Sequence, residues 1–358
     1  MQSFTTTLLV CLVLLLGFGA CQNAEAPPAM KTTVVEGKTM GTYYRVKYRD
    51  AENRDFKAVF DSLLVAINLE VSTYIPNSTI STFNRSADTF DLAYNPNTQG
   101  LDYFNKHFIT NFKAAQEIVA ATDAYFDPTV MPLVNYWGFG YTEKKPVTNV
   151  DSLAIDSLNQ FIGMDKVELI GGAHSMLLVK KEASTQLDFS AIAKGYAVDQ
   201  LGEILSEAGI TDFLVDIGGE TVARGNSERG GPWRLGINVP KEEAAINDIE
   251  VIVPLKDQGL ATSGNYRNFY EVAGKKYSHT INPKTGFPER STLLSASVFA
   301  KDCMTADGYA TGFMVLGLER SMQLATQIEG IEACFIYSKP DGQLDIQYTP
   351  ALASIFEK

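Results

Sequence analysis

The order of helix and strand patterns along the chain places the strongest limit on its fold. Segments 55–71 and 101–122 carry apolar residues at helical spacing. Segments 167–180 and 269–281 each show two strand-like runs joined by a glycine-containing turn. A doubly wound parallel sheet needs strands that alternate regularly with helices, but here hairpins and helices follow one another in mixed order. The pattern therefore favours an α+β fold over a doubly wound parallel sheet.

A segment punctuated by prolines follows the second predicted helix. Pro128 and Pro132 cannot lie inside a continuing helix, so Tyr125, Phe126 and Asp127 are expected in a turn. Aromatic rings beside a carboxylate suit a site that grips a planar ring and a polar group. The same residues are also typical of ordinary loop packing, and the pattern alone does not separate the two interpretations.

Segment 187–199, LDFSAIAKGYAVD, has the pattern of a strand end, a cap and the first turns of a helix. Asp188 closes the strand, Ser190 is placed to cap the helix, and Lys194 lies one turn further on. A helix N-terminus beside an acid and a lysine favours binding of a phosphorylated ligand. A capped surface helix is the alternative interpretation.

Two oxygen-bearing side chains and one histidine are further candidates for chemistry. Asp307 and Thr311 lie four residues apart in a predicted helix over 303–316, so they share one face. Their oxygens suit Mg²⁺, although such a pair is commonly surface decoration. His279 lies on the second arm of the 269–281 hairpin, as a candidate general base or as a structural histidine.

Several common catalytic motifs are absent from the sequence. The chain has no Walker loop, no GxGxxG after a strand and no GxSxG elbow, which disfavours P-loop enzymes, Rossmann dehydrogenases and α/β-hydrolases. It also has no CxxC motif or Cys/His cluster, which argues against a thiolate zinc site. Cys303 and Cys334, the cysteines outside the N-terminal region, could form a disulfide or remain buried thiols.

The first residues are typical of an export signal. Residues 8–16 form an apolar run, and small residues precede Cys21 in an arrangement that resembles a bacterial lipoprotein cleavage site. The expected organisation is a signal peptide over 1–20, a lipidated Cys21 and tether over 21–30, and one folded domain over 31–358. An uncleaved anchor is the alternative, and both interpretations predict export.

The net charge of −12 disfavours a nucleic-acid-binding protein, because such proteins present basic surfaces. An anionic ligand would instead need local positive features, such as a helix end, a lysine or a bound metal ion. The candidate residues described above supply features of this kind.

Nine motifs between about residue 37 and residue 317 resemble those of the ApbE family, the bacterial FAD:protein FMN transferases. In chain order they are GKTMGTYYRV, STYIPNSTISTFN, FDPTV, LDFSAIAKGYAVD, VDIGGE, WRLGIN, ATSGNYR, SHTINPKTG and CMTADGYAT. The resemblance implies a T-fold-like α+β architecture, a duplicated unit with FAD between its halves. It also implies a Mg²⁺-dependent reaction, in which FAD is split at its pyrophosphate, FMN passes to a threonine hydroxyl of an acceptor protein, and AMP leaves.

The resemblance also assigns roles to individual residues. The implied FAD contacts are Met40, Tyr74, Tyr125, Phe126, Asp127, Asp188, Lys194 and Ile281. The implied Mg²⁺ ligands are the side chains of Asp307 and Thr311 and the backbone carbonyl of Ala191. His279 suits the task of taking the threonine proton, since an unperturbed histidine has a pKa of about 6.5.

Two departures from the family pattern leave alternatives open. Ala124-Tyr125 replaces the usual Gly-Ala, and Ala310 stands where some members carry a second acid. The alternative functions are an FAD pyrophosphatase that uses water as nucleophile, as in some family members, and a flavin-binding lipoprotein without catalysis, which Ala310 leaves open. The expected acceptors are flavin-carrying subunits of Na⁺-translocating NADH:quinone reductase and of the related Rnf complex. The expected location is the periplasmic face of a bacterial membrane.

Overall fold

The computed structural model describes residues 30–92, 105–142, 147–172, 175–238, 249–265, 269–272 and 275–356. The predicted signal peptide, Cys21 and the tether up to residue 29 lie outside these ranges. Within the described ranges, no helix combines the length and the apolar character needed to cross a lipid bilayer.

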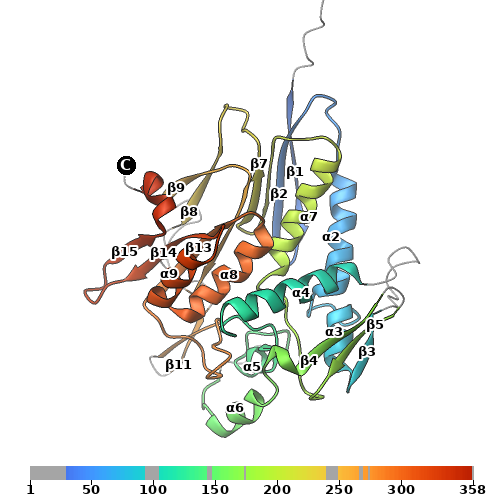
Figure 1. Ribbon diagram of the computed structural model, residues 1–358, viewed down its shortest axis with the longest axis vertical. Coiled ribbons are helices and arrows are strands. Elements are labelled where there is room, and N and C mark those ends of the chain that lie inside the picture. The colour runs from blue at the N-terminus through green and yellow to red at the C-terminus, as the bar shows by residue number, and fades with distance from the viewer. Residues whose placement is uncertain are drawn as a thin grey trace, which may run out of the picture.

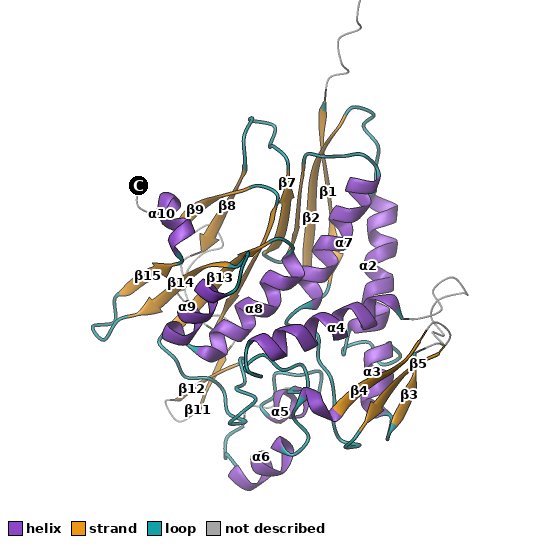
Figure 2. Cartoon of the chain, in the orientation of Figure 1, coloured by secondary structure: helices purple, strands orange, loops and turns teal. Residues whose placement is uncertain are grey.

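An eight-stranded antiparallel sheet forms the centre of the molecule (Figures 1 and 2). In spatial order its strands are β1 (Lys31–Thr39), β2 (Thr42–Asp50), β6 (Phe213–Ile217), β7 (Glu220–Arg224), β10 (Gln258–Gly264), β13 (Leu293–Ala300), β14 (Glu332–Ser338) and β15 (Leu344–Tyr348). The first four of these strands precede the last four in the sequence, so the sheet consists of two consecutive halves that join at β7 and β10. The sheet confirms the predicted α+β class.

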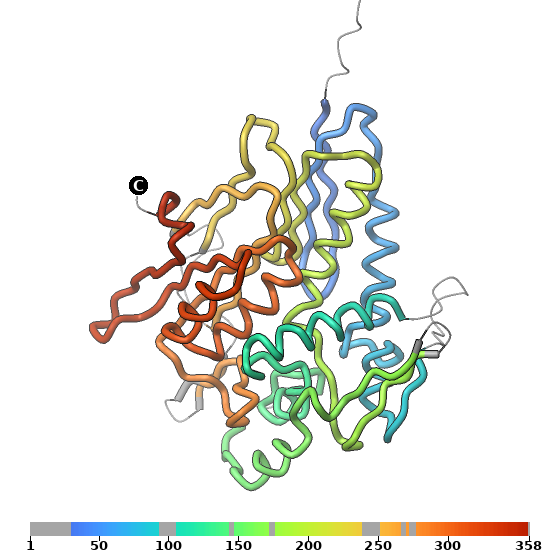
Figure 3. Tube along the Cα trace, viewed as in Figure 1, coloured from blue at the N-terminus to red at the C-terminus, as the bar shows by residue number. Residues whose placement is uncertain are grey.

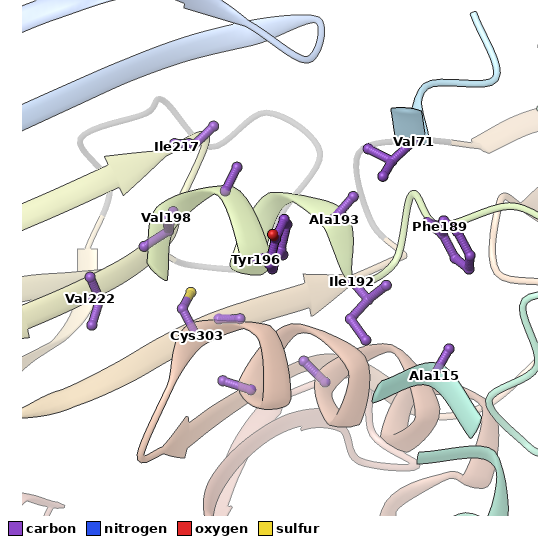
Figure 4. Packing of buried hydrophobic residues seen from close by; sticks show 14 of the residues in the cluster. Val71, Ala115, Phe189, Ile192, Ala193, Tyr196, Val198, Ile217, Val222 and Cys303 are labelled. Carbon is purple, nitrogen blue, oxygen red and sulfur yellow. The ribbon is translucent and has the colours of Figure 1, made fainter. Parts of the chain in front are cut away.

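Two helices, α7 (Ala193–Glu207) and α8 (Cys303–Leu316), cover one face of the sheet and pack against each other (Figure 1). Their approach is close, because a Cβ on Gly195 would lie 2.3 Å from the carbonyl oxygen of Cys303. Figure 4 shows Cys303 at the start of α8, beside α7, among the buried side chains of the main core. The layer is completed by α2 (Lys57–Val71), α4 (Lys106–Ala121) and α9 (Leu318–Gln327).

A second hydrophobic cluster covers the opposite face of the sheet. It includes side chains of β8 (Trp233–Asn238), β9 (Ile249–Leu255), the 3₁₀ turn η2 (Pro350–Leu352) and α10 (Ala353–Phe356). Successive strand residues point to opposite faces, and Phe335 accordingly belongs to the main core while Cys334 belongs to the second cluster. Cys303 lies in the main core, and both cysteines are buried free thiols. The structure thus favours the thiol interpretation over the disulfide.

A smaller layer lies beyond the helices, around a three-stranded sheet (Figure 2). Its elements are α3 (Thr79–Arg85), β3 (Thr89–Asp91), α5 (Met131–Tyr136), α6 (Ser152–Asn159), the 3₁₀ turn η1 (Met164–Lys166), β4 (Val167–Gly172) and β5 (Ser175–Lys180). A separate hairpin is formed by β11 (Phe269–Val272) and β12 (Lys275–Ser278). Segments distant in sequence meet here, as the trace in Figure 3 shows. The backbone N–H of Asp188 donates to the Pro128 carbonyl at 2.8 Å, and the Trp137 indole donates to the Gly286 carbonyl at 2.7 Å.

The structure corrects two local predictions. Ser190 does not cap α7, which begins at Ala193 without a side-chain cap. Instead, the backbone N–H and the hydroxyl of Ser190 donate to Asp188 Oδ1 at 2.9 and 2.6 Å, because an aspartate readily closes a turn onto the residue two positions later. The second correction concerns His279, which follows the end of β12 rather than lying on the strand.

Candidate functional site

A pocket of ≈ 370 Å³ lies where the two halves of the large sheet join. Lys194 at the start of α7 and Glu220 at the start of β7 come from the first half. Thr262 of β10, with Asp307 and Thr311 of α8, comes from the second half. The turn after α4 and the segment after β12 complete the wall. The pocket is therefore a product of the whole fold.

Eleven of the twelve predicted site residues line this pocket, namely Tyr74, Tyr125, Phe126, Asp127, Asp188, Ala191, Lys194, His279, Ile281, Asp307 and Thr311. Met40 is not part of the lining. It occupies the turn between β1 and β2 with a left-handed φ of 47° and packs against the main core. This turn adjoins the turn between β6 and β7, where the Gly218 N–H donates to the Tyr43 carbonyl at 3.1 Å. The assignment of Met40 to FAD binding stays a prediction.

Lys194 carries a positive charge on the floor of the pocket. Its Nζ lies 2.5 Å from Glu220 Oε1 in an ion pair. Burial alone would lower the pKa of Lys194, but the negative charges of Asp307 and Glu220 outweigh burial and raise it above the ordinary value. The ammonium group is therefore protonated at neutral pH and suited to an anionic ligand.

Asp307 and Glu220 are both buried carboxylates beside this lysine, with 3% and 4% of their surfaces exposed. Asp307 Oδ2 accepts a hydrogen bond from the backbone N–H of Gly195 at 3.0 Å. Burial raises the pKa of both carboxyls, while the charge of Lys194 lowers it. Two buried acids thus share one lysine.

Glu220 is the functional candidate that the sequence reasoning missed. Its side-chain atom Oε2 is buried and has no hydrogen-bond partner among the described residues. The signal in the sequence was an acid directly after two glycines at the end of a strand, in Gly218-Gly219-Glu220. Such a turn is common enough that it did not identify a site by itself.

The residues predicted to hold Mg²⁺ fit that ion chemically. Asp307, Thr311 and Ala191 all line the pocket and offer a carboxylate, a hydroxyl and a backbone carbonyl, the oxygen ligands that Mg²⁺ prefers. Thr311 Oγ1 also lies 3.1 Å from Ser263 Oγ. The described residues contain no group of three or more His, Cys, Asp or Glu able to hold a metal. A single-carboxylate site of this kind suits Mg²⁺, which keeps several waters and binds phosphate oxygens.

Two further acids in the lining shape the pocket wall through local turns. Asp127 Oδ1 accepts from the backbone N–H of Thr129 at 2.8 Å and from its hydroxyl at 2.6 Å. Asp188 Oδ1 accepts in the same way from Ser190. Burial raises the pKa of both carboxyls, and these hydrogen bonds partly oppose that rise. Both turns are therefore fixed by their acid.

Tyr125 forms part of the wall and is held by two cations. The Lys284 Nζ and the Arg320 guanidinium carbon lie 4.4 and 4.3 Å from its ring centroid. Arg320 also donates a hydrogen bond to the Tyr125 hydroxyl. The preceding residues, Asp123 and Ala124, have left-handed φ angles of 49° and 57°, although neither is glycine. At this departure from the expected Gly-Ala pair, Tyr125 thus makes contacts with two cations of its own chain.

The remaining lining residues complete the rim. Tyr74 is 62% exposed at the edge of the pocket, so most of its ring is accessible to a ligand. His279 is half-buried, and its ring centroid lies 6.4 Å from that of Phe139 in an edge-on arrangement. Ile281 is buried and bridges to Pro288, which fixes the segment after His279.

Sequence comparison relates the chain to flavin transferases. The model of the ApbE family matches residues 40–335. A Klebsiella pneumoniae protein named FAD:protein FMN transferase is 35% identical over 347 residues, which cover 96% of this chain and 94% of that protein. The protein of the same name from Vibrio cholerae is 34% identical, over 93% of this chain and 94% of its own length.

Solved structures give the same relationship. Flavin Transferase ApbE from Vibrio cholerae matches with a TM-score of 0.78 and 32% identity, over 91% of this chain and 100% of that chain. The apo form of Pseudomonas stutzeri flavinyl transferase ApbE matches with a TM-score of 0.77 and 31% identity, over 92% of this chain and 98% of that chain. From its pocket, its fold and these relatives, the chain belongs to the ApbE family.

Proposed function

We propose that this protein is an FAD:protein FMN transferase and that the pocket between the two sheet halves is its active site. The observation that carries the proposal is the gathering of eleven residues, assigned to FAD, metal and proton transfer, in one pocket. These residues come from five separate parts of the chain, so their convergence is not a consequence of sequence proximity. The names of the relatives describe the same activity.

The architecture supports a T-fold-like duplication with FAD between its halves. In the first half, β1 and β2 precede helices α2 and α7, and β6 and β7 follow them. In the second half, β10 and β13 precede α8 and α9, and β14 and β15 follow. Each half is thus a unit of two strands, packed helices and two strands, and the pocket lies at the junction.

The pocket offers FAD a surface for its rings and a charge for its pyrophosphate. Tyr74, Tyr125 and Phe126 provide aromatic contacts. Lys194, kept protonated by two neighbouring carboxylates, provides a cation for the phosphates. Asp307, Thr311 and the carbonyl of Ala191 would hold Mg²⁺. When bound, that ion supplies neutralisation of the pyrophosphate charge, as phosphoryl transfer requires.

The reaction then needs a base and a nucleophile in line with the phosphorus atom. The threonine hydroxyl oxygen of the acceptor forms a bond to the phosphorus of the FMN phosphate, and the bond between that phosphorus and the bridging oxygen breaks. AMP leaves with the bridging oxygen and its electron pair. His279, half-buried in the pocket wall, takes the hydroxyl proton.

A transfer assay tests this function directly. The protein is incubated with FAD, Mg²⁺ and an acceptor domain that carries the target threonine, and flavin fluorescence is then measured on the denatured acceptor. Fluorescent acceptor is the expected result, and an acceptor with Thr→Val is the matched control. AMP and free FMN without labelled acceptor would instead identify a pyrophosphatase, and neither product would identify a binding protein.

The acceptor and the location complete the proposal. The proposed acceptors are flavin-carrying subunits of Na⁺-translocating NADH:quinone reductase or of an Rnf complex. The proposed location is the periplasmic face of the membrane, with a lipid on Cys21; the apolar run at residues 8–16 and the small residues before Cys21 support it. Mass spectrometry of the mature N-terminus tests this location. A Cys21→Ala variant should leave the membrane fraction.

A further inference from the structure

Glu220 is placed in the pocket by the turn that precedes it. Gly218 and Gly219 adopt φ angles of 66° and 108°, which residues with side chains rarely adopt. A Cβ on Gly218 would also lie 2.8 Å from the Thr42 side chain. The turn therefore fixes the start of β7, and Glu220 lines the pocket from that position.

The two oxygens of the Glu220 carboxylate have different surroundings. Oε1 contacts the Lys194 ammonium at 2.5 Å. Oε2 is buried and has no hydrogen-bond partner among the described residues. An unpaired buried carboxylate oxygen is costly, and native structures rarely retain one unless an ordered water, a ligand or an ion supplies the partner. The missing partner of Oε2 must be a cation or a hydrogen-bond donor that enters the pocket.

The charges around Glu220 favour a cation. Asp307 and Glu220 are two buried acids in the pocket beside one base, Lys194, so by formal charge the cluster has one excess negative charge when all three groups are ionised. A divalent cation reverses the sign of this cluster, which then complements the two negative charges of a pyrophosphate.

We propose that Glu220 is the second acidic side chain of the divalent-cation site, beside Asp307. The inference rests on the proposed function, since it concerns the same pocket. It gives Lys194 a second task, which is to occupy Glu220 Oε1 and leave Oε2 for the cation.

Binding of Mn²⁺ to the protein without FAD tests this role without any activity measurement. Free Mn²⁺ is measured by electron paramagnetic resonance as the protein is titrated. Glu220→Gln keeps the size of the side chain but removes its charge, and it should weaken Mn²⁺ binding by about 10-fold or more. Glu203→Gln, which removes an exposed acid on α7 outside the pocket, should bind as the wild type does.

A second variant and a second ligand separate the possible outcomes. Circular dichroism establishes that each variant is folded; if Glu220→Gln is not, Glu220→Asp, which keeps the charge on a shorter stem, should show an intermediate Mn²⁺ affinity. Wild-type Mn²⁺ affinity in the folded Glu220 variant, together with weakened FAD binding in the absence of metal, would overturn the proposal and leave Glu220 as a positioning residue for Lys194. Glu220-dependent Mn²⁺ binding by a protein that transfers no FMN would support the metal role and reject the proposed function instead.

Discussion

The Asp307 carboxylate on α8 accepts a hydrogen bond from the backbone N–H of Gly195 on α7, at 3.0 Å. This bond joins the two halves of the fold at the floor of the pocket. It leaves the other carboxylate oxygen, Oδ1, for a ligand. One side chain therefore contributes to both the packing of the helices and the proposed metal site.

We expect Asp307→Asn to reduce kcat/KM for FMN transfer by at least about 100-fold, because a bound metal ion contributes several kcal/mol to the transition state. The amide can still accept the Gly195 hydrogen bond, so the fold should persist. The measurement is the initial rate of acceptor labelling, with Glu319→Gln on exposed α9 as control. Full activity in Asp307→Asn would reject the metal assignment.

Gly195→Ala should destabilise the protein, because the added Cβ would lie 2.3 Å from the Cys303 carbonyl oxygen. Overpacking of this kind costs about 1–3 kcal/mol in the free energy of unfolding. Gly202→Ala on the same helix is the matched control, since its Cβ would meet side chains only, the Phe213 ring at 3.1 Å and Val222 Cγ1 at 3.3 Å. There, the higher helix propensity of alanine offsets the contact by about 1 kcal/mol. Urea denaturation of both variants measures the free energy of unfolding and so tests how closely α7 and α8 approach each other.

Arg320→Ala should release Tyr125 without unfolding the protein, because Arg320 is exposed. The expected result is a KM for FAD that rises about 5- to 30-fold with kcat unchanged, since a cation–π contact contributes about 0.5–1 kcal/mol and the hydrogen bond a similar amount. Arg290→Ala removes a similar cation from the Tyr277 ring, outside this pocket, and should leave both constants unchanged. A change in kcat with constant KM would place Tyr125 in the chemical step instead.

Stability should fall in acid through the pair formed by Asp50 and Arg54. Side-chain hydrogen bonds from Arg54 lower the pKa of Asp50 to about 2. The unfolded chain has an ordinary carboxyl pKa of about 3.9. Because the folded value is the lower one, the ionised carboxylate stabilises the fold above about pH 4, and this contribution is lost as the pH falls towards 2.

Asp50→Asn should therefore flatten the dependence of the unfolding free energy on pH between about 2 and 4. Urea denaturation at several pH values measures this slope. Asp341→Asn, at an exposed turn between β14 and β15, serves as the control and should keep the wild-type slope. An unchanged slope in Asp50→Asn would show that other carboxyls determine the acid sensitivity.

Local patterns in the sequence predicted the α+β class and several elements closely. The predicted helix 303–316 is α8 with the same bounds, because apolar spacing and a capping aspartate define it locally. The cap of α7 could not be predicted in this way. Ser190 has the right side chain, but Asp188 competes for it, and only the fold decides between the two hydrogen-bonding patterns.

Motif resemblance predicted most of the pocket, but contacts between distant segments were not accessible to it. The ion pair of Lys194 with Glu220 depends on how β7, paired antiparallel with β6, lies relative to α7. No local sequence pattern encodes that arrangement. The position of Met40 outside the lining depends likewise on how the β1–β2 turn packs on the core. Membership of the pocket could be inferred from motifs, whereas contacts between individual side chains of different segments required the structure.

The lining of the pocket begins at Tyr74 and ends at Val315. A ribosome synthesises the chain from its N-terminus, so the first half of the sheet emerges long before α8. Until α8 has emerged, the nascent chain lacks Asp307 and Thr311 and has one wall of the pocket without the other. The complete pocket therefore forms only after α8 has joined the fold, late in the synthesis of the chain.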